Sequence, residues 1–193
     1  AWLLYGLGAE SEDLPGYVVL VSTGKGGQQQ PIAMRQWASG FLPSKFQGVK
    51  LNSIGDPVLY IQNPPGVNAQ MQRDGITAVN ALNKLQYEAV KDPEILTRIN
   101  QYELAFKMQG KVPELLDISR EPQKTLDEYG VKPGPAGAFA RQCLMARRLS
   151  EAGVRFVEIC HPGWDQHNNL HQGLIRNAAA TDRPTAALLA DLE

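Results

Sequence analysis

The last third of the chain places an amphipathic helical segment directly before a short run of strand-forming residues. Residues 136–152 carry apolar side chains at helical spacing, and Gly153 follows them as a typical helix end. Residues 154–160 read VRFVEIC and have the apolar, β-rich composition of a central strand in a largely parallel sheet. This order predicts an α/β fold, in which helices flank a mostly parallel central sheet.

Two other short runs are predicted to be strands. Residues 17–21 and 57–61 are apolar, rich in β-forming residues and bounded by turn formers. Residues 22–30 read STGKGGQQQ, but the GxxxxGK[ST] spacing of a phosphate-binding loop is absent. We therefore interpret this glycine-rich segment as a connecting loop.

The middle of the chain, residues 77–130, is almost entirely helical in pattern. We expect it to form a helical insertion or cap packed on the α/β body. Its clearest helix begins at Asp92, an N-cap that is followed by proline, and is predicted to end at Gly110. A shorter helix is predicted over residues 121–129, ending before Gly130.

We expect four charged residues of the predicted helices to be exposed to solvent. Glu103 and Lys107 are four residues apart and are predicted to form an exposed ion pair. Arg147 and Arg148 lie on the helix before the strand at 154–160. We expect them on a solvated face rather than in an anion-binding site.

Charge and composition exclude several kinds of partner. The 193 residues include 19 Lys plus Arg and 20 Asp plus Glu, so the net charge of -1 gives no support for nucleic-acid binding. The longest apolar stretches are far shorter than the roughly 20 residues that cross a bilayer, so no membrane span is expected. The two cysteines, Cys143 and Cys160, lack the CxxC spacing of zinc or redox sites, and we interpret Cys160 as a small core residue.

All three histidines of the chain lie within the eleven residues that follow the strand predicted at 154–160. His161, His167 and His171 stand there with Asp165. Imidazole and carboxylate groups are ligands that divalent zinc, iron or manganese accept, and ligands of α/β proteins bind at the carboxyl ends of strands. The cluster therefore predicts a functional site, with an ordinary polar surface loop as the alternative.

Several separated motifs resemble one bacterial family. They cover essentially the whole chain in the family's order: WLLYGLGAESEDLPGYVVL, SGFLPSKFQGVKL, LLDISREPQKTLDEYGV, FARQCLMARRLSEAGVRFVEI and HPGWDQHNNLHQGL. The chain is similar to the sulfatase-like group called domain of unknown function 1501, within the alkaline phosphatase superfamily. This resemblance implies an α/β sandwich with a two-metal site for divalent zinc, manganese or calcium, which hydrolyses phosphate or sulfate esters.

The resemblance also implies roles for individual residues. Asp165 looks like the superfamily's metal-binding aspartate, and His167 looks like its partnering histidine. The superfamily commonly places this histidine four residues after the aspartate, where this chain has Asn169, so His171 is the alternative. The predicted metal ligands are therefore Asp165, His167 and His171, and the residues predicted to orient them or to contact substrate are His161, Trp164 and Asn168.

The ends of the sequence carry a further expectation. The chain begins at Ala1 without a leader and ends in a helical pattern that starts near Asp182 and Pro184. We expect residues 1–193 to be the central part of one alkaline-phosphatase-like domain, incomplete at both ends. Such a piece would leave a sheet edge unpaired and should associate.

Two functions fit these observations. The first is a metal-dependent hydrolase acting on phosphate or sulfate esters of small molecules or polysaccharides. By the resemblance, its nucleophile lies outside this segment, so the catalytic residue is unknown and the chain alone is expected to be inactive. The second is a non-catalytic α/β module that binds a protein or polysaccharide partner. The export signals common in the family imply a periplasmic or secreted location for either.

Overall fold

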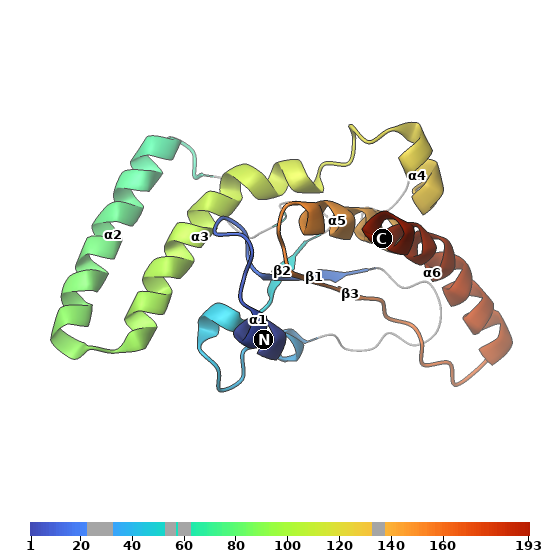
Figure 1. The fold of residues 1–193 in the computed structure, drawn as a ribbon, viewed down its shortest axis with the longest axis horizontal. Coiled ribbons are helices and arrows are strands. Elements are labelled where there is room, and N and C mark those ends of the chain that lie inside the picture. The colour runs from blue at the N-terminus through green and yellow to red at the C-terminus, as the bar shows by residue number, and fades with distance from the viewer. Residues whose placement is uncertain (23–32, 53–56, 58–62, 133–137) are drawn as a thin grey trace.

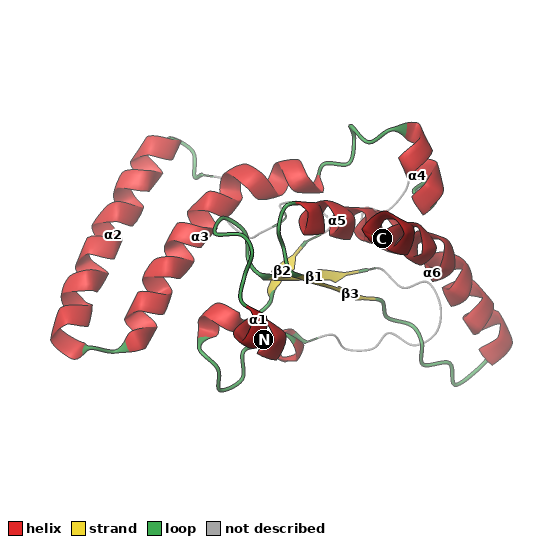
Figure 2. Ribbon diagram, in the orientation of Figure 1, coloured by secondary structure: helices red, strands yellow, loops and turns green. Residues whose placement is uncertain are grey.

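A small parallel sheet lies at the centre of the fold. The computed structural model describes residues 1–22, 33–52, 57, 63–132 and 138–193. In this part of the chain, one open sheet has the strand order β2-β1-β3, where β1 is Tyr17–Val21, β2 is Val49–Leu51 and β3 is Phe156–Cys160. Figure 2 shows the strands surrounded by helices. The predicted α/β fold with a parallel sheet is confirmed.

The middle strand of the described sheet is β1. Its central residues Val18, Val19 and Leu20 have no exposed surface, which explains why the run is apolar at every position. The register places Leu20 beside Leu51 of β2 and Ile159 of β3. All three strands therefore end at the same edge of the sheet.

The strand predictions are confirmed in part. Strands occur at 17–21 and within 154–160, but the central position assigned to 154–160 belongs to β1 among the described strands. β2 is too short to show a clear pattern and escapes prediction. The strand predicted at 57–61 and most of the loop at 22–30 lie outside the described residues.

One helix precedes β3 in the chain and another follows it. α5 (Phe139–Glu151) packs against β3, and α6 (Leu170–Leu192) packs against α5 (Figure 1). Buried side chains from the sheet, from α5 and from other parts of the chain form one hydrophobic cluster. Its members are Leu14, Val18, Leu20, Leu51, Met108, Val112, Ile118, Tyr129, Cys143, Leu144, Met145, Ala146, Leu149 and Val154.

The remaining helices occupy the first two thirds of the chain. α2 (Ala69–Val90) and α3 (Pro93–Leu116) form a hairpin, with α2 at the outer edge of the molecule and α3 between α2 and the sheet (Figure 1). α4 (Gln123–Tyr129) packs on α5 and α6. Shorter elements are α1 (Trp2–Leu7) and the 3-10 helices η1 (Met34–Gln36) and η2 (Ser44–Phe46).

Two helices run past the positions where the sequence predicts breaks. α3 continues through Gly110 and Pro113 to Leu116 because its last turns bury Met108 and Val112 in the core. Burying two such side chains contributes about 2 kcal/mol each, which together offsets the roughly 1 kcal/mol cost of a helical glycine and the roughly 3 kcal/mol cost of proline. α6 likewise runs unbroken through Pro184, a buried residue, so the predicted new helix start there is wrong.

The predicted exposed ion pair between Glu103 and Lys107 is wrong. Glu103 instead accepts hydrogen bonds from Arg73 at 2.7 Å and from Asn80 at 2.9 Å, which tie α3 to α2. Lys107 pairs with Asp13 at 3.0 Å. Each side chain has a partner from a distant segment, which outweighs the i, i+4 interaction.

Arg147 and Arg148 do not lie on a solvated face. Their side chains are 15% and 21% exposed, and both bind the carboxylate of Glu121, which is 7% exposed. Arg148 also donates to the backbone carbonyl of Leu115 at 2.8 Å. The face of α5 that bears them is covered by neighbouring helices, so these arginines join α5 to the end of α3 and the start of α4.

Candidate functional site

Two polar residues meet at the carboxyl edge of the sheet. Ser22 directly follows β1 and His161 directly follows β3, so the parallel pairing of these strands brings the two side chains together. Ser22 Oγ lies 2.5 Å from His161 Nδ1 and donates to the Cys160 carbonyl oxygen at 3.3 Å. The Ser22 backbone N–H donates to the same carbonyl at 2.9 Å. Ser22 is 3% exposed, so this contact is held inside the fold.

We infer the tautomer of the His161 imidazole from these contacts. If the Ser22 hydroxyl donates to the Cys160 carbonyl, it accepts from His161 Nδ1, and in this arrangement Nδ1 carries the hydrogen and Nε2 carries a lone pair. Nε2 is buried and has no hydrogen-bond partner among the described residues. Burial lowers the pKa of His161 below its usual 6.5, so the ring is neutral at pH 7. The result is a neutral imidazole with a free acceptor atom.

Aromatic rings enclose this imidazole. The Phe139 ring, at the start of α5, lies 5.0 Å from the His161 ring, and the Trp164 ring lies 6.3 Å away, both in edge-on geometry. Trp164 is 44% exposed, so it forms a partial wall between His161 and solvent. The His161 and Trp164 rings therefore lie side by side at the end of β3.

Asp165 and His167 are in direct contact. Asp165 Oδ1 lies 2.9 Å from His167 Nε2, and their side chains are 42% and 70% exposed. His171 is exposed in the first turn of α6, and Asn168 is exposed in the loop before it. Across the residues that the structure describes, no group of three or more His, Cys, Asp or Glu side chains is close enough to hold a metal ion.

The loop that carries these residues is anchored on α6. Asn177, which is 1% exposed, donates from Nδ2 to the Gly163 carbonyl at 2.5 Å. Gly173 lets the loop approach the helix, because a Cβ there would lie 2.5 Å from Gln166 Cγ. Asn169 occupies the N-cap position of α6 with φ of 53°. Its side chain makes no capping hydrogen bond to the first turn of the helix.

Sequence reasoning misses three residues of this region: Ser22, Asn177 and Gly173. Ser22 has a recognisable signal, because it is the first polar residue after a fully apolar strand, at the carboxyl edge where ligands bind. Asn177 and Gly173 have none, since their roles depend on how α6 meets the loop.

Cys160 is not activated as a nucleophile. Burial and the neighbouring Glu158 carboxylate raise the pKa of the Cys160 thiol to about 11. Its Sγ donates to Glu158 Oε1 at 3.5 Å. The thiol is therefore protonated at neutral pH, as expected for a residue without a catalytic role.

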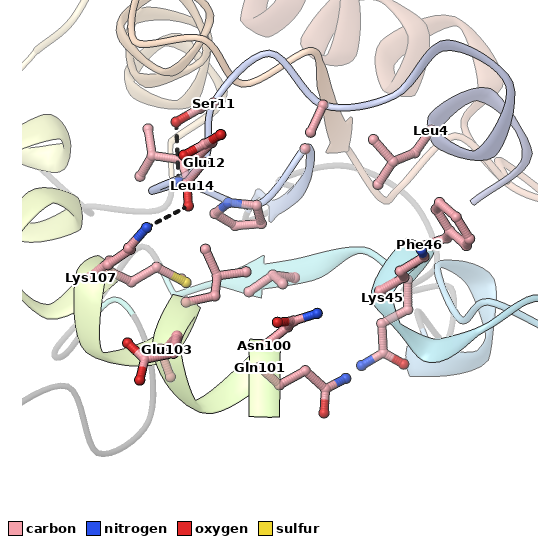
Figure 3. Close-up of a pocket in the computed structure, with 18 of the residues that line it drawn as sticks. Leu4, Ser11, Glu12, Leu14, Lys45, Phe46, Asn100, Gln101, Glu103 and Lys107 are labelled. Atoms are coloured by element: carbon pink, nitrogen blue, oxygen red, sulfur yellow. Dashed lines mark hydrogen bonds between the residues drawn. The ribbon is translucent and has the colours of Figure 1, made fainter. Parts of the chain in front are cut away.

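A cavity of about 720 Å³ lies elsewhere on the molecule. It is lined by the segment before β1, by η2 and by α3, and so it sits near the amino ends of β1 and β2 (Figure 3). Lys107 points across it and donates to the Glu12 carbonyl oxygen at 3.3 Å. Its lining contains none of the predicted site residues, so it is separate from the edge that holds Ser22 and His161.

Comparison with known proteins decides the family. The family described as protein of unknown function (DUF1501) matches residues 1–193. The chain belongs to this family. The membership of the DUF1501 family, stated from the motifs, is thereby confirmed. No curated protein and no solved structure matches the chain.

The helices were also compared with the length and hydropathy of membrane spans. Within the described ranges, none is both long and apolar enough to cross a bilayer. The expectation that the chain has no membrane-spanning helix therefore holds for these residues.

Proposed function

We propose that this DUF1501 chain is part of a metal-dependent hydrolase of phosphate or sulfate esters, related to the alkaline phosphatase superfamily and exported from the cell. The observation that carries the proposal is the Nε2 of His161 at the carboxyl edge of a parallel sheet, which is buried and has no hydrogen-bond partner in the described part of the chain. The Asp165–His167 pair in the same short loop supports it. A lone pair kept free in this position is an acceptor for a reacting group rather than a structural contact.

The residues present fit a divalent cation in part. With ligand bonds of about 2.0–2.2 Å, neighbouring ligands of a tetrahedral zinc ion are roughly 3.3 Å apart, close to the 2.9 Å between Asp165 Oδ1 and His167 Nε2. A small rotation of these exposed side chains and loss of the ring proton would let both bind one cation. A third ligand from His171 would require the loop to move, because no three such side chains of the described residues are close enough together to hold a metal. A bound cation would supply Lewis-acid stabilisation of negative charge on the ester.

The chain's own residues have distinct roles in this proposal. Ser22 holds the His161 ring through Nδ1, and His161 Nε2 accepts the proton of a water or hydroxyl group that attacks the ester. Trp164 limits water on one side of the imidazole. Asn177 fixes the loop by its bond to the Gly163 carbonyl, which keeps Asp165 and His167 near the sheet edge.

Hydrolysis assays test this proposal on the full-length protein. Aryl phosphate and aryl sulfate esters are supplied with zinc, manganese or calcium, and the variant His161→Gln is compared with wild type. We expect metal-dependent release of the phenol and a loss of about 100-fold or more in the variant, as for removal of a general base. Substitution of the exposed Asp74 on α2 is the control. Absence of turnover with every ester and metal would contradict the proposal.

The alternative function is a binding module, and the cavity favours it. A volume of about 720 Å³ lies in the range of ligand pockets, and the lining mixes apolar residues such as Leu14 and Met108 with the amides of Asn100 and Gln101. Calorimetry with soluble oligosaccharides would separate the two functions. Binding that Asn100→Ala abolishes, without ester turnover, would favour the binding module.

A further inference from the structure

The face of α2 that packs on α3 is largely polar. Arg73 and Asn80 point from α2 to Glu103 of α3, at 2.7 and 2.9 Å. The Arg73 guanidinium also lies 4.0 Å from the centre of the Phe106 ring. An ordinary surface helix turns its apolar side to the protein and its polar side to water. α2 departs from this pattern, because its large apolar side chains Leu82 and Leu85 face solvent.

Six small or apolar residues of α2 form an exposed seam on the opposite side. The seam residues are Met71, Gly75, Ala78, Leu82, Leu85 and Ala89. Their alternating spacing of four and three residues is the repeat that pairs two helices in a coiled coil. All six are exposed, and Leu82 and Leu85 retain 66% and 69% of their surface. The side chains of the described residues leave this seam open to solvent.

The order of large and small residues along the seam is self-complementary. We propose that α2 pairs antiparallel with α2 of a second copy of the chain. In this pairing Gly75 faces Leu85 of the second copy, and the two-fold symmetry repeats the contact. Met71 then faces Ala89 and Ala78 faces Leu82, so every layer joins a large side chain to a small one. A parallel pair would place Leu against Leu and Gly against Gly.

Gly75 supports this pairing independently. It stands inside a long helix, where glycine is among the least favourable residues, yet a Cβ at this position would meet no atom within 4 Å. Nothing within the described chain requires the missing side chain. In the antiparallel pair, the space beside Gly75 receives Leu85 of the second copy.

The place of α2 in the molecule permits the contact. α2 forms the outer edge of the molecule, and α3 separates it from the sheet and from α5 and α6 (Figure 1). A second copy can therefore approach the seam without meeting the other described elements. The 22 residues of α2 span about 33 Å, so a pairing along this one helix forms a small interface, and we expect weak, concentration-dependent association.

Charged residues beside the seam make the antiparallel pairing distinguishable from a parallel one. Asp74 and Glu88 border it, and in this register Asp74 lies near Glu88 of the second copy. Their repulsion is screened by salt, so association should strengthen as ionic strength rises. A parallel pair would place Asp74 near Val79 instead and would show no such dependence.

Sedimentation velocity over a micromolar concentration range tests the proposal. We expect a monomer–dimer equilibrium in the wild type that tightens with salt. Gly75→Leu, which sets Leu against Leu, and Leu85→Ala, which leaves a void, should each weaken it about tenfold or more. The double variant Gly75→Leu/Leu85→Ala restores one large and one small residue per layer and should recover the dimer. Leu189→Ala, an equally exposed leucine on α6, should leave it unchanged.

Three outcomes would overturn the proposal. The first is a wild type that stays monomeric throughout this range. The second is association that neither single substitution weakens, as expected if copies join through a sheet edge. The third is a double variant no better than the single ones. Circular dichroism of each variant checks that the total helix content is unchanged, and none of these results depends on the proposed hydrolase activity.

Discussion

At the scale of single residues, Glu121 is an almost fully buried acid that binds two arginines. Its carboxylate is 7% exposed and receives both Arg147 and Arg148. Burial by itself would raise the Glu121 pKa, but the hydrogen bonds from Arg148 and Arg147 outweigh it and hold the pKa below the usual 4.5. Removing one member of such a group leaves buried charge without a partner.

Glu121→Gln should therefore lower the free energy of unfolding by about 2–4 kcal/mol at pH 7, measured by urea unfolding. Because the folded pKa lies below 4.5, the ionised carboxylate stabilises the fold above pH 4.5, and this contribution is lost as the pH falls from 4.5 through the folded pKa. The difference between variant and wild type should shrink over that window. Glu128→Gln, at a 3.7 Å surface pair with Lys124, should change stability by under about 1 kcal/mol. An equal effect of both substitutions would contradict this assignment.

The second prediction for a single residue concerns which nitrogen of the His161 ring carries the proton. Nitrogen-15 shifts of the imidazole should identify Nδ1 as protonated and Nε2 as the bare acceptor. Ser22→Ala removes the oxygen that accepts from Nδ1 and should shift the ring toward the other tautomer, whereas Ser22→Thr keeps a hydroxyl and should preserve the wild-type signal. Protonated Nε2 in the wild type would refute the assigned role of Ser22.

At the scale of elements, the contact between α6 and the loop at 162–169 positions the candidate site. Gly173 is the point of closest approach, because a Cβ there would lie 2.5 Å from Gln166 Cγ. Gly110, inside α3, has no atom within 4 Å of the same position. The two glycines therefore respond differently to the same substitution.

Gly173→Ala should lower the free energy of unfolding by about 1–2 kcal/mol, because the loop must move away from the helix. Gly110→Ala should raise it by up to about 1 kcal/mol, the gain of alanine over glycine in a helix. Thermal and urea unfolding of both variants measures the difference. Stabilisation by Gly173→Ala would show that the loop does not rest on α6.

The elements also show where sequence reasoning succeeds and where it stops. β1 follows from a continuous apolar run, β3 follows from a mostly apolar run rich in β-forming residues, and the end of α4 follows from Gly130, which has φ of 68°. The passage of α3 through Pro113 does not follow from local signals, because it depends on the burial of Val112 in the core. Tertiary packing overrides local propensity at such points.

At the scale of the whole molecule, the two ends of the sheet carry different features. Ser22 and His161 meet at the carboxyl edge, whereas the cavity lies near the amino ends of β1 and β2. The histidine cluster and its position after β3 could be predicted from the sequence. The contact between Ser22 and His161 could not, because it joins residues 139 positions apart through strand pairing.

The proposed hydrolase depends on a metal ion, which Asp165 and His167 are proposed to bind. Isothermal titration calorimetry of zinc and manganese into the full-length protein tests this binding most directly, with Asp165→Ala, His167→Ala and the control Asp74→Ala measured alongside. We predict that each of the first two substitutions weakens binding about 10-fold or more, that the control does not, and that affinity falls from about pH 8 to about pH 5 because protons compete for the ligands. Equal affinity in wild type and both loop variants would contradict the claim.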